Sequence, residues 1–483
     1  MTELTRRTFA ALLLGGAATL SAPVLAGAGA PRHRPEPRGW RAGFSTPDAR
    51  PQSTMTRLHG RLPEGLRGVL YRNGPAQFER AGERLGHWFD GDGMIQRFEI
   101  GDGSLRHRGR FVETDKRRVE EAAGRFAYAG FGFSPKHARG SARPDDINVA
   151  NTSVLTFGDE IWALWEGGSP WRIDADTLET LGRKAFEGGA DGLPFSAHPK
   201  YDRDGAIWNF GAFGRRCVIW RLGADGALDR AQLLELPAPS LMHDFAITER
   251  FVILVMPPLL HTGAPAATVI DQHEWRADEP MRVAVIDKAT LTVRSVYELP
   301  ARFLFHIGNA YESADGEIRF DAFLSDDADF ARHGARALAQ GVYHDDPGAR
   351  PCLIRLKPSG GASIEVHDGR GEFPQIDKRL ATRRHDRLYG ATPTGLGCWD
   401  WRTGEFASFD YGADHWSEEP LFVPKSSGGS DGWLIATALN GAAARTELHV
   451  FDAQQLADGP VASFACPYAL PLGFHGTFAP AQA

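Results

Sequence analysis

Cysteine is scarce in this chain of 483 residues, which has only four: Cys217, Cys352, Cys398 and Cys466. No two of them form a CxxC pair. A disulfide scaffold or a thiolate zinc site needs grouped cysteines, so this spacing argues against both. We expect four free and mostly buried cysteines.

Sequence signals of several other protein classes are also missing. No GxxxxGK[ST], HExxH or CxxCH motif occurs, which removes the usual support for P-loop NTPases, zincins and c-type cytochromes. The formal net charge is -7. Nucleic-acid binding would require a clustered basic face, which nothing in the chain predicts, so we expect no nucleic-acid partner.

The N-terminal segment resembles a twin-arginine export signal. Arg6 and Arg7 precede Phe9, the apolar run Ala10–Leu20 and small residues as far as Ala30. The apolar run is too short for a stable transmembrane helix. The alternative is a chance Arg-Arg pair before a short buried helix.

We therefore predict a signal peptide over residues 1–30, a Pro- and Arg-rich linker over 31–50 and a single domain over 51–483. The twin-arginine route carries folded proteins. It suits a protein that acquires its cofactor before export to the periplasm or the medium.

The rest of the chain is typical of an all-β protein. Its 55 Gly and 31 Pro predict many turns, and its 29 Phe and 12 Trp favour strands. A loose repeat of strand, Asp- or Gly-containing turn and strand recurs at Ile161–Leu181, Ile207–Leu236, Val283–Leu299, Arg387–Tyr411 and Leu448–Phe464. This pattern predicts antiparallel propeller blades.

The length of the mature chain indicates about seven blades of ~60 residues, more than the ~40–45 of a bare four-stranded blade. The surplus predicts loops gathered on one face. Residues 115–147 and 325–350 are the expected insertions.

Four of the 17 histidines have apolar or small neighbours near the start of a predicted strand. They are His198, His243, His306 and His475, separated by 45, 63 and 169 residues. Protonated imidazole is costly to bury, so these side chains should be neutral and partnered. For each one alone, a hydrogen-bonded core histidine is the simpler interpretation. In a propeller, however, the innermost strands face one axis where four histidines can meet, and neutral imidazole suits Fe, Zn, Cu and Ni.

Three glutamates lie in apolar or Gly-rich settings, namely Glu166, Glu372 and Glu419. Histidines that bind a metal usually donate their second N–H to a carboxylate or carbonyl, which these glutamates would provide. A surface or strand-end position is the alternative for each. The sequence does not assign a glutamate to a particular histidine.

A series of short blocks resembles the carotenoid cleavage oxygenase family, which includes carotenoid, apocarotenoid and stilbene oxygenases. The blocks run in the family's order from about residue 55 to 478. They comprise Tyr71–Pro75, His87–Met94, Asn151-Thr152, Ala163–Gly168, Thr177–Gly182, Ala197–Pro199, Met242–Asp244, Phe305-His306, Glu372–Ile376, Glu419–Val423 and Gly473–Gly476.

The resemblance implies an all-β, seven-bladed β-propeller with a cap of loops and short helices over one face. It implies Fe(II) held by His198, His243, His306 and His475, with Glu166, Glu372 and Glu419 accepting from three of these rings. It also implies that O2 and an electron-rich C=C bond give two carbonyl products, with no catalytic residue beyond the metal centre.

An apolar polyene, a carotenoid or an apocarotenoid, is the expected substrate. Stilbene-cleaving members of the family carry a Lys directly before the glutamate that is Glu166 here, and this chain has Trp165. An apolar aromatic suits a polyene better than a phenolate, which leaves stilbene or phenylpropanoid cleavage as the alternative. A third hypothesis is a non-catalytic propeller that only binds a ligand, against which the four histidines and their acidic partners argue.

A carotenoid substrate would lie in a membrane, so the resemblance further implies a peripheral membrane contact through an apolar rim. The candidates are Phe131 with Phe133, and the run Met256–Leu260. Both segments can equally belong to the core.

Overall fold

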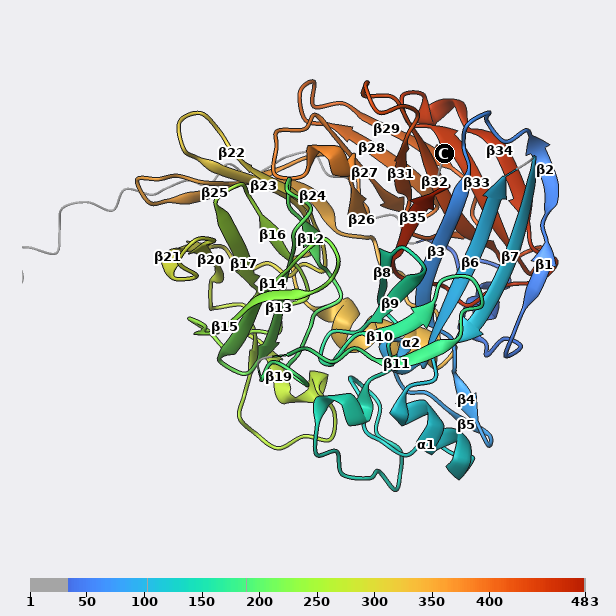
Figure 1. The fold of residues 1–483 in the computed structure, drawn as a ribbon, viewed down its shortest axis with the longest axis horizontal. Coiled ribbons are helices and arrows are strands. Elements are labelled where there is room, and N and C mark those ends of the chain that lie inside the picture. The colour runs from blue at the N-terminus through green and yellow to red at the C-terminus, as the bar shows by residue number, and fades with distance from the viewer. Residues whose placement is uncertain (1–33, 102, 188, 482–483) are drawn as a thin grey trace, which may run out of the picture. The chain divides into compact units, whose positions relative to one another are not determined.

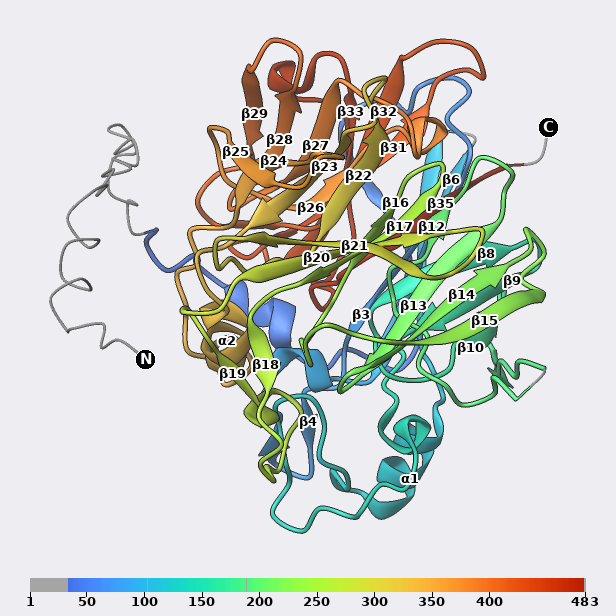
Figure 2. The same cartoon turned by 90° about the vertical axis from the view of Figure 1, so that its left-hand side faces the viewer.

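Short antiparallel strands follow one another through nearly the whole chain. The computed structural model describes residues 34–481 except 102 and 188, so the predicted signal peptide lies outside the described residues. Pro35–Ala483 form one compact unit. Within it, seven sheets of four to six strands surround a central axis (Figures 1 and 2), which confirms the predicted seven-bladed propeller.

Five blades are simple meanders whose strands run outward from the axis in chain order. Because each blade is local in sequence, tight turns suffice to build it. The strands are β8 (Ser153–Phe157), β9 (Glu160–Leu164), β10 (Trp171–Asp174) and β11 (Thr180–Arg183); β12 (Lys200–Tyr201), β13 (Ile207–Phe213), β14 (Arg216–Leu222) and β15 (Leu228–Glu235); β16 (Phe245–Ile247), β17 (Phe251–Met256), β20 (Met281–Asp287) and β21 (Val293–Leu299); β22 (Ile307–Glu312), β23 (Ile318–Leu324), β24 (Arg350–Leu356) and β25 (Ala362–Val366); and β26 (Glu372–Gln375), β27 (Arg387–Thr392), β28 (Gly395–Asp400) and β29 (Phe406–Asp410).

Two further blades combine strands from both ends of the chain. In one, the C-terminal strand is innermost, and the order is β35 (Gly476–Pro480), β3 (Gly68–Pro75), β6 (Gly93–Gly101), β7 (Ser104–Phe111) and β1 (Gln52–Thr54). In the other, an N-terminal strand is outermost, and the order is β31 (Leu421–Pro424), β32 (Gly432–Asn440), β33 (Arg445–Asp452), β34 (Pro460–Ala465) and β2 (Thr56–Gly60), with β30 (His415–Ser417) also on β32. These two exchanges close the ring.

Helices and two small hairpins gather over one face of the propeller and form the predicted cap (Figures 1 and 2). They are α1 (Asp115–Ala123), the π-helix Phe330–Gly334 that leads into α2 (Ala335–Ala339), β4 (Glu79–Arg80) with β5 (Glu83–Arg84), and β18 (Leu259–His261) with β19 (His273–Trp275). Both α-helices fall within the predicted insertions. Single-turn 3-10 helices span Trp40–Phe44, Trp88–Asp90, Pro144–Ile147, Ile270–Gln272, Lys378–Leu380 and Leu456–Asp458.

Helix α1 is held in the cap by buried charges. The Thr114 side chain caps its first turn by accepting the Arg117 N–H at 3.1 Å. On its inner face, Lys116 Nζ lies 2.9 Å from Asp92 Oδ1 and 2.8 Å from Glu120 Oε2. Arg80 donates to the other Asp92 oxygen at 2.7 Å. Since buried ions need partners, this cluster fixes how α1 docks on the start of β6.

The apolar core fills the spaces between neighbouring blades. Val283 and Val285 of β20, for example, share one cluster with Phe320 of β23 and Ile354 of β24. All four cysteines are free and buried, as predicted. None of the helices within the described ranges has the length and apolarity needed to cross a bilayer.

Part of the segment predicted as a linker packs against the rest of the protein. Trp40 and Phe44 have no solvent-exposed surface. Trp40 stacks on Trp416 with ring centroids 6.0 Å apart, and Phe44 meets the edge of Trp88 at 4.9 Å. Aromatic burial of this size anchors Trp40–Phe44 to β30 and the cap.

Candidate metal centre

The four histidines singled out from the sequence stand at equivalent places in four blades. His198 and His243 come two residues before the innermost strands β12 and β16, and His306 and His475 come directly before β22 and β35. Because the innermost strands of a propeller begin near one axis, their first residues converge. The ligand nitrogens of all four histidines lie within 4.8 Å of one another.

The ring nitrogens face a common point. Nε2 of His243 lies 2.9 Å from Nε2 of His198 and 3.2 Å from Nε2 of His306. The His475 ring centroid is 4.7 Å from those of both His198 and His306. Metal–nitrogen bonds of about 2.0–2.1 Å place neighbouring ligand atoms roughly 3 Å apart, so these separations suit one metal ion.

Three of the imidazoles have pKa values shifted toward the neutral form. Burial lowers the pKa of His198, His243 and His306 well below the ordinary value, and neighbouring histidines lower it further. Neutral rings whose Nδ1–H points outward leave several Nε2 lone pairs facing one another. A divalent cation at their centre would satisfy these lone pairs, which is the arrangement a metal requires of its ligands.

The three predicted glutamates surround these rings. Glu372 Oε2 lies 2.5 Å from His306 Nδ1, and Glu419 Oε1 lies 2.8 Å from His475 Nδ1. Glu166 Oε1 is 3.3 Å from His243 Nδ1 and 3.5 Å from His198 Nε2. The geometry thus pairs Glu372 with His306 and Glu419 with His475, and it places Glu166 beside His243 and His198, which the sequence alone left open.

The pKa values of the three glutamates shift in different directions. Burial raises the pKa of Glu372 to about 8, although the Phe373 N–H opposes it. Burial also raises the pKa of Glu166 well above its ordinary value. The pKa of Glu419 is lowered, because His475, Arg72 and the Gly476 N–H together outweigh its burial.

Three charged residues that sequence reasoning did not single out support the centre. Arg72 is 2% exposed and donates to the Glu419 backbone carbonyl at 2.7 Å. Lys200 Nζ lies 2.8 Å from Asp244 Oδ1, and Asp244 Oδ2 accepts the Ile307 N–H at 2.8 Å. These contacts tie together the strands that follow His198, His243 and His306. Arg72 and Asp244 lie within the blocks Tyr71–Pro75 and Met242–Asp244 that resemble the family, and Lys200 lies two residues after His198; these positions were the sequence signals.

Aromatic rings line the same region. Phe305 lies 5.2 Å from the His243 ring, and Phe373 stacks on His306 at 5.1 Å. Phe373 has a φ of 57°, a left-handed conformation that is unusual for a bulky residue. Phe89 meets Phe305 at 6.0 Å, and all three rings are only partly buried. Trp165, next to Glu166, is also half-buried.

The two segments considered as a membrane rim do not form an exposed rim. Met256 and Leu259 are 1% and 0% exposed because they belong to blade and cap cores. Phe131 packs on His87 and Phe89, with ring centroids 5.1 and 5.5 Å apart. Phe133 packs on Phe126 at 5.5 Å.

Comparison with known proteins gives consistent matches over most of the chain. A family model described as retinal pigment epithelial membrane protein matches residues 44–480. The apocarotenoid-15,15'-oxygenase of Synechocystis sp. is 28% identical over 485 residues, covering 92% of this chain and 96% of the relative. The lignostilbene-alpha,beta-dioxygenase isozyme III of Sphingomonas paucimobilis is 28% identical over 463 residues, covering 88% and 93%.

A solved structure agrees with these matches. Cobalt-substituted Synechocystis apocarotenoid oxygenase superposes with a TM-score of 0.82 at 26% sequence identity, over 92% of this chain and 98% of that chain.

Proposed function

This chain belongs to the retinal pigment epithelial membrane protein family, which comprises carotenoid and related alkene-cleaving oxygenases, and we propose that it is an iron-dependent oxygenase that cleaves a C=C bond of a carotenoid or apocarotenoid. One O2 and one double bond give two carbonyl groups, which balances the reaction. The observation that carries the proposal is the convergence of four imidazoles, whose ligand nitrogens lie within 4.8 Å of one another.

In this proposal His198, His243, His306 and His475 hold Fe(II). Imidazole suits iron, and four neutral ligands leave the metal's charge to be offset by nearby carboxylates. Glu372 and Glu419 accept from the rings of His306 and His475 and fix their orientation, and Glu166 lies 3.3 Å from Nδ1 of His243. Bound iron supplies the one-electron and O2 chemistry that side chains lack.

The chain's own side chains then have to position the substrate and exclude water. Phe305 makes an edge contact with the His243 ring and Phe373 stacks on the His306 ring, so both would offer apolar surface to a polyene. Neither side chain donates a proton or accepts one, so the proposal assigns no catalytic acid or base.

A polyene is the preferred substrate, and a stilbene or phenylpropanoid is the second candidate. The relatives include both apocarotenoid and stilbene oxygenases at 28% identity, so overall similarity does not discriminate. Trp165 favours the polyene, since a Lys at this position would bind a phenolate. A propeller that merely binds a ligand has no use for four convergent histidines with carboxylate partners.

The test is cleavage by purified protein loaded anaerobically with Fe(II). A detergent-solubilised carotenoid, an apocarotenal and a hydroxystilbene are supplied separately under O2, and oxygen uptake and carbonyl products are measured. We expect iron-dependent cleavage of a polyene. Cleavage of the hydroxystilbene alone would transfer the proposal to the second candidate, and no cleavage with iron bound would contradict both.

We also propose a peripheral membrane contact through the cap face, because a carotenoid must be taken from a bilayer. Val342, directly beyond α2, is 59% exposed, the largest fraction among the large hydrophobic residues described. A Val342→Asp variant should bind liposomes less than the parent protein in a flotation assay. Equal flotation would contradict this contact.

Finally, we propose twin-arginine export of the folded, iron-loaded protein to the periplasm or the medium. Support comes from the order of Arg6, Arg7, Phe9 and the apolar run that follows. Replacing both arginines with Lys should retain the protein in the cytoplasm in a fractionation assay. Unchanged export would contradict the route.

A further inference from the structure

Three of the four histidines lie one or two residues before the innermost strands of consecutive blades. β12 begins two residues after His198, β16 begins two residues after His243, and β22 begins immediately after His306. A side chain held on so short a stretch of backbone moves with the strand behind it. The first residues of β12, β16 and β22 therefore set where the three imidazoles lie.

The carboxylate of Asp244, which is 3% exposed, contacts the first residue of all three strands. Its Oδ1 accepts the Phe245 N–H at 2.7 Å, and its Oδ2 accepts the Ile307 N–H at 2.8 Å. Lys200 Nζ lies 2.8 Å from Oδ1 and 3.1 Å from Oδ2. One carboxylate therefore connects three blades at the level of the proposed metal ligands.

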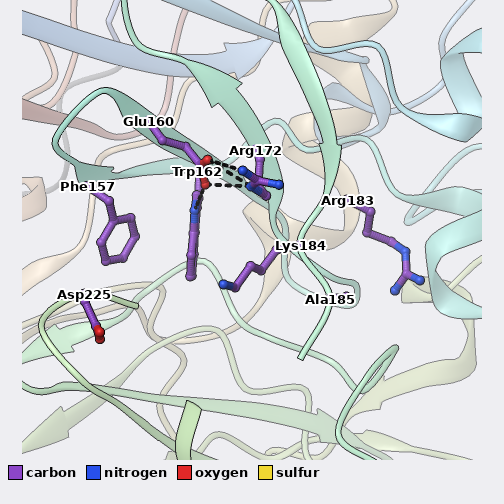
Figure 3. A pocket seen from close by; sticks show the side chains of 8 residues that line it. All are labelled: Phe157, Glu160, Trp162, Arg172, Arg183, Lys184, Ala185 and Asp225. Carbon is purple, nitrogen blue, oxygen red and sulfur yellow. Dashed lines mark hydrogen bonds and ion pairs between the residues drawn. The ribbon is translucent and has the colours of Figure 1, made fainter. Parts of the chain in front are cut away.

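An ion pair within one blade has a different role. In the cleft shown in Figure 3, Arg172 of β10 donates to Glu160 of β9 at 2.9 and 2.6 Å. Backbone hydrogen bonds already join these two strands. By contrast, β12, β16 and β22 belong to three separate sheets of the described chain. No backbone ladder aligns them with one another, so side-chain contacts such as those of Asp244 have to do so.

The contacts of Asp244 require a carboxylate. Both of its oxygens accept a backbone N–H, whereas an amide offers one accepting oxygen and one donating NH2 group. An Asn at this position would turn its NH2 group toward the N–H of either Phe245 or Ile307, and that strand would lose its partner. A neutral amide would also attract the Lys200 ammonium group less strongly than a carboxylate does.

The fourth histidine is held in a related way. Glu419 Oε2 accepts the N–H of Gly476, the first residue of β35, at 2.8 Å, and its Oε1 lies 2.8 Å from Nδ1 of His475. The strands behind all four histidines thus have their first residue bound to a carboxylate. Asp244 reaches its strands through two backbone N–H groups and Lys200, so its effect on a bound metal is indirect.

We propose that Asp244 is a positioning residue of the metal centre, which holds His198, His243 and His306 at the separations that one metal ion requires. This inference rests on the proposed function, because it takes these histidines as iron ligands. Without the Asp244 carboxylate, the three blades can shift relative to one another. The separations between the Nε2 atoms then change, and the site binds metal more weakly while the blades themselves stay folded.

The test is metal binding by the purified full-length protein. Fe(II) affinity is measured by competition with a chelator, and the visible absorption of the Co(II)-loaded protein reports ligand geometry. The variants are Asp244→Asn and Lys200→Met, and circular dichroism checks their folding. The matched control is Asp92→Asn, at a carboxylate of the cap that is also buried and bound to a lysine.

We expect Asp244→Asn to bind iron about 10–100-fold more weakly than the parent protein and to change the Co(II) bands. Lys200→Met should lose less affinity. The double variant should bind iron about as weakly as Asp244→Asn alone, because both substitutions break the same link. Asp92→Asn should keep the parent affinity and the parent Co(II) bands, although its fold is less stable.

Parent affinity and parent Co(II) bands in Asp244→Asn would overturn the inference, as would an equal loss of affinity in Asp92→Asn. If Asp244→Asn does not fold, parent affinity in Lys200→Met would overturn it instead. Cleavage plays no part in these readouts. A parent protein that binds no metal would refute the proposed function together with this inference, whereas unchanged binding in the variants would refute this inference alone.

Discussion

Nδ1 of His306 lies 2.5 Å from Oε2 of Glu372, although 66 residues separate the two in the chain. His306 directly precedes β22, and Glu372 begins β26, the innermost strand of the neighbouring blade. The contact turns Nε2 of His306 toward the other histidines. His475 and Glu419 form the same kind of pair at 2.8 Å. The blade arrangement thus sets the orientation of the rings.

Replacing Glu372 with Gln should weaken iron affinity or turnover by about 10–100-fold. Substitutions of residues that hydrogen-bond to metal ligands have effects of this size at other metal sites. The amide keeps the size of the side chain but is a weaker acceptor for the His306 N–H. Iron affinity is measured by competition with a chelator. Glu298→Gln, at a side chain that is 62% exposed, is the control, and an equal effect in both variants would contradict the assigned role.

Replacing His243 or His475 with Ala should abolish both iron retention and cleavage, because each removes one of four converging nitrogens. Iron per chain is measured by mass spectrometry after desalting, and circular dichroism checks the fold. His59→Ala, at an exposed histidine of β2, should retain full iron. Normal iron content and turnover in both site variants would show that the ligand assignment is wrong.

Phe373→Gly should have a free energy of unfolding about 1 kcal/mol higher than that of Phe373→Ala. Both variants lose the ring that stacks on His306. Only glycine also relieves the left-handed backbone, whose φ is 57°. Urea unfolding of the two variants side by side measures the difference. Equal stability would mean that the backbone at Phe373 is unstrained.

Asp92→Asn should lower the free energy of unfolding by about 3–5 kcal/mol, because three buried cations, Lys116, Arg80 and Arg117, lose a carboxylate that they share, and the buried Glu120 alone does not balance their charge. Asp278→Asn, at a side chain that is 74% exposed, should change it by less than about 1 kcal/mol. Urea unfolding at neutral pH provides the comparison. Similar losses in both variants would contradict the role of the cluster.

The same cluster predicts a dependence on pH. Burial raises the pKa of Asp92, but Lys116, Arg80 and Arg117 outweigh it and hold the pKa at about 2, below the ordinary 3.8. A pKa that is lower in the folded state means that the stabilisation is complete above about pH 4 and is lost as the pH falls through 2. The stability difference between the parent protein and Asp92→Asn should therefore shrink in that window. A constant difference would contradict the shift.

Much of the fold could be predicted from the sequence, because the strands of a propeller blade follow one another closely along the chain. Segments such as Val283–Leu299 and Arg387–Tyr411 carry both strands of a hairpin and the turn between them, and the structure forms β20–β21 and β27–β29 there. The four histidines stood out through their apolar neighbours and their place before predicted strands. The structure brings all four together.

Other features depend on contacts between distant segments, which no local pattern encodes. The pairing of Glu372 with His306 depends on which blades are neighbours. Trp40 and Phe44 are buried because they pack against β30 and the cap, whereas the Pro- and Arg-rich composition of their segment predicted a linker. Phe131 and Met256 are apolar in sequence whether they face solvent or core, so only the three-dimensional structure shows that Met256 is buried and that Phe131 packs on His87.

The most direct test of the account is diffraction from crystals of the iron-loaded protein at the iron absorption edge. The account predicts one anomalous peak per chain, surrounded by Nε2 of His198, His243, His306 and His475. Iron bound elsewhere, or no peak among these four rings at full iron content, would contradict it.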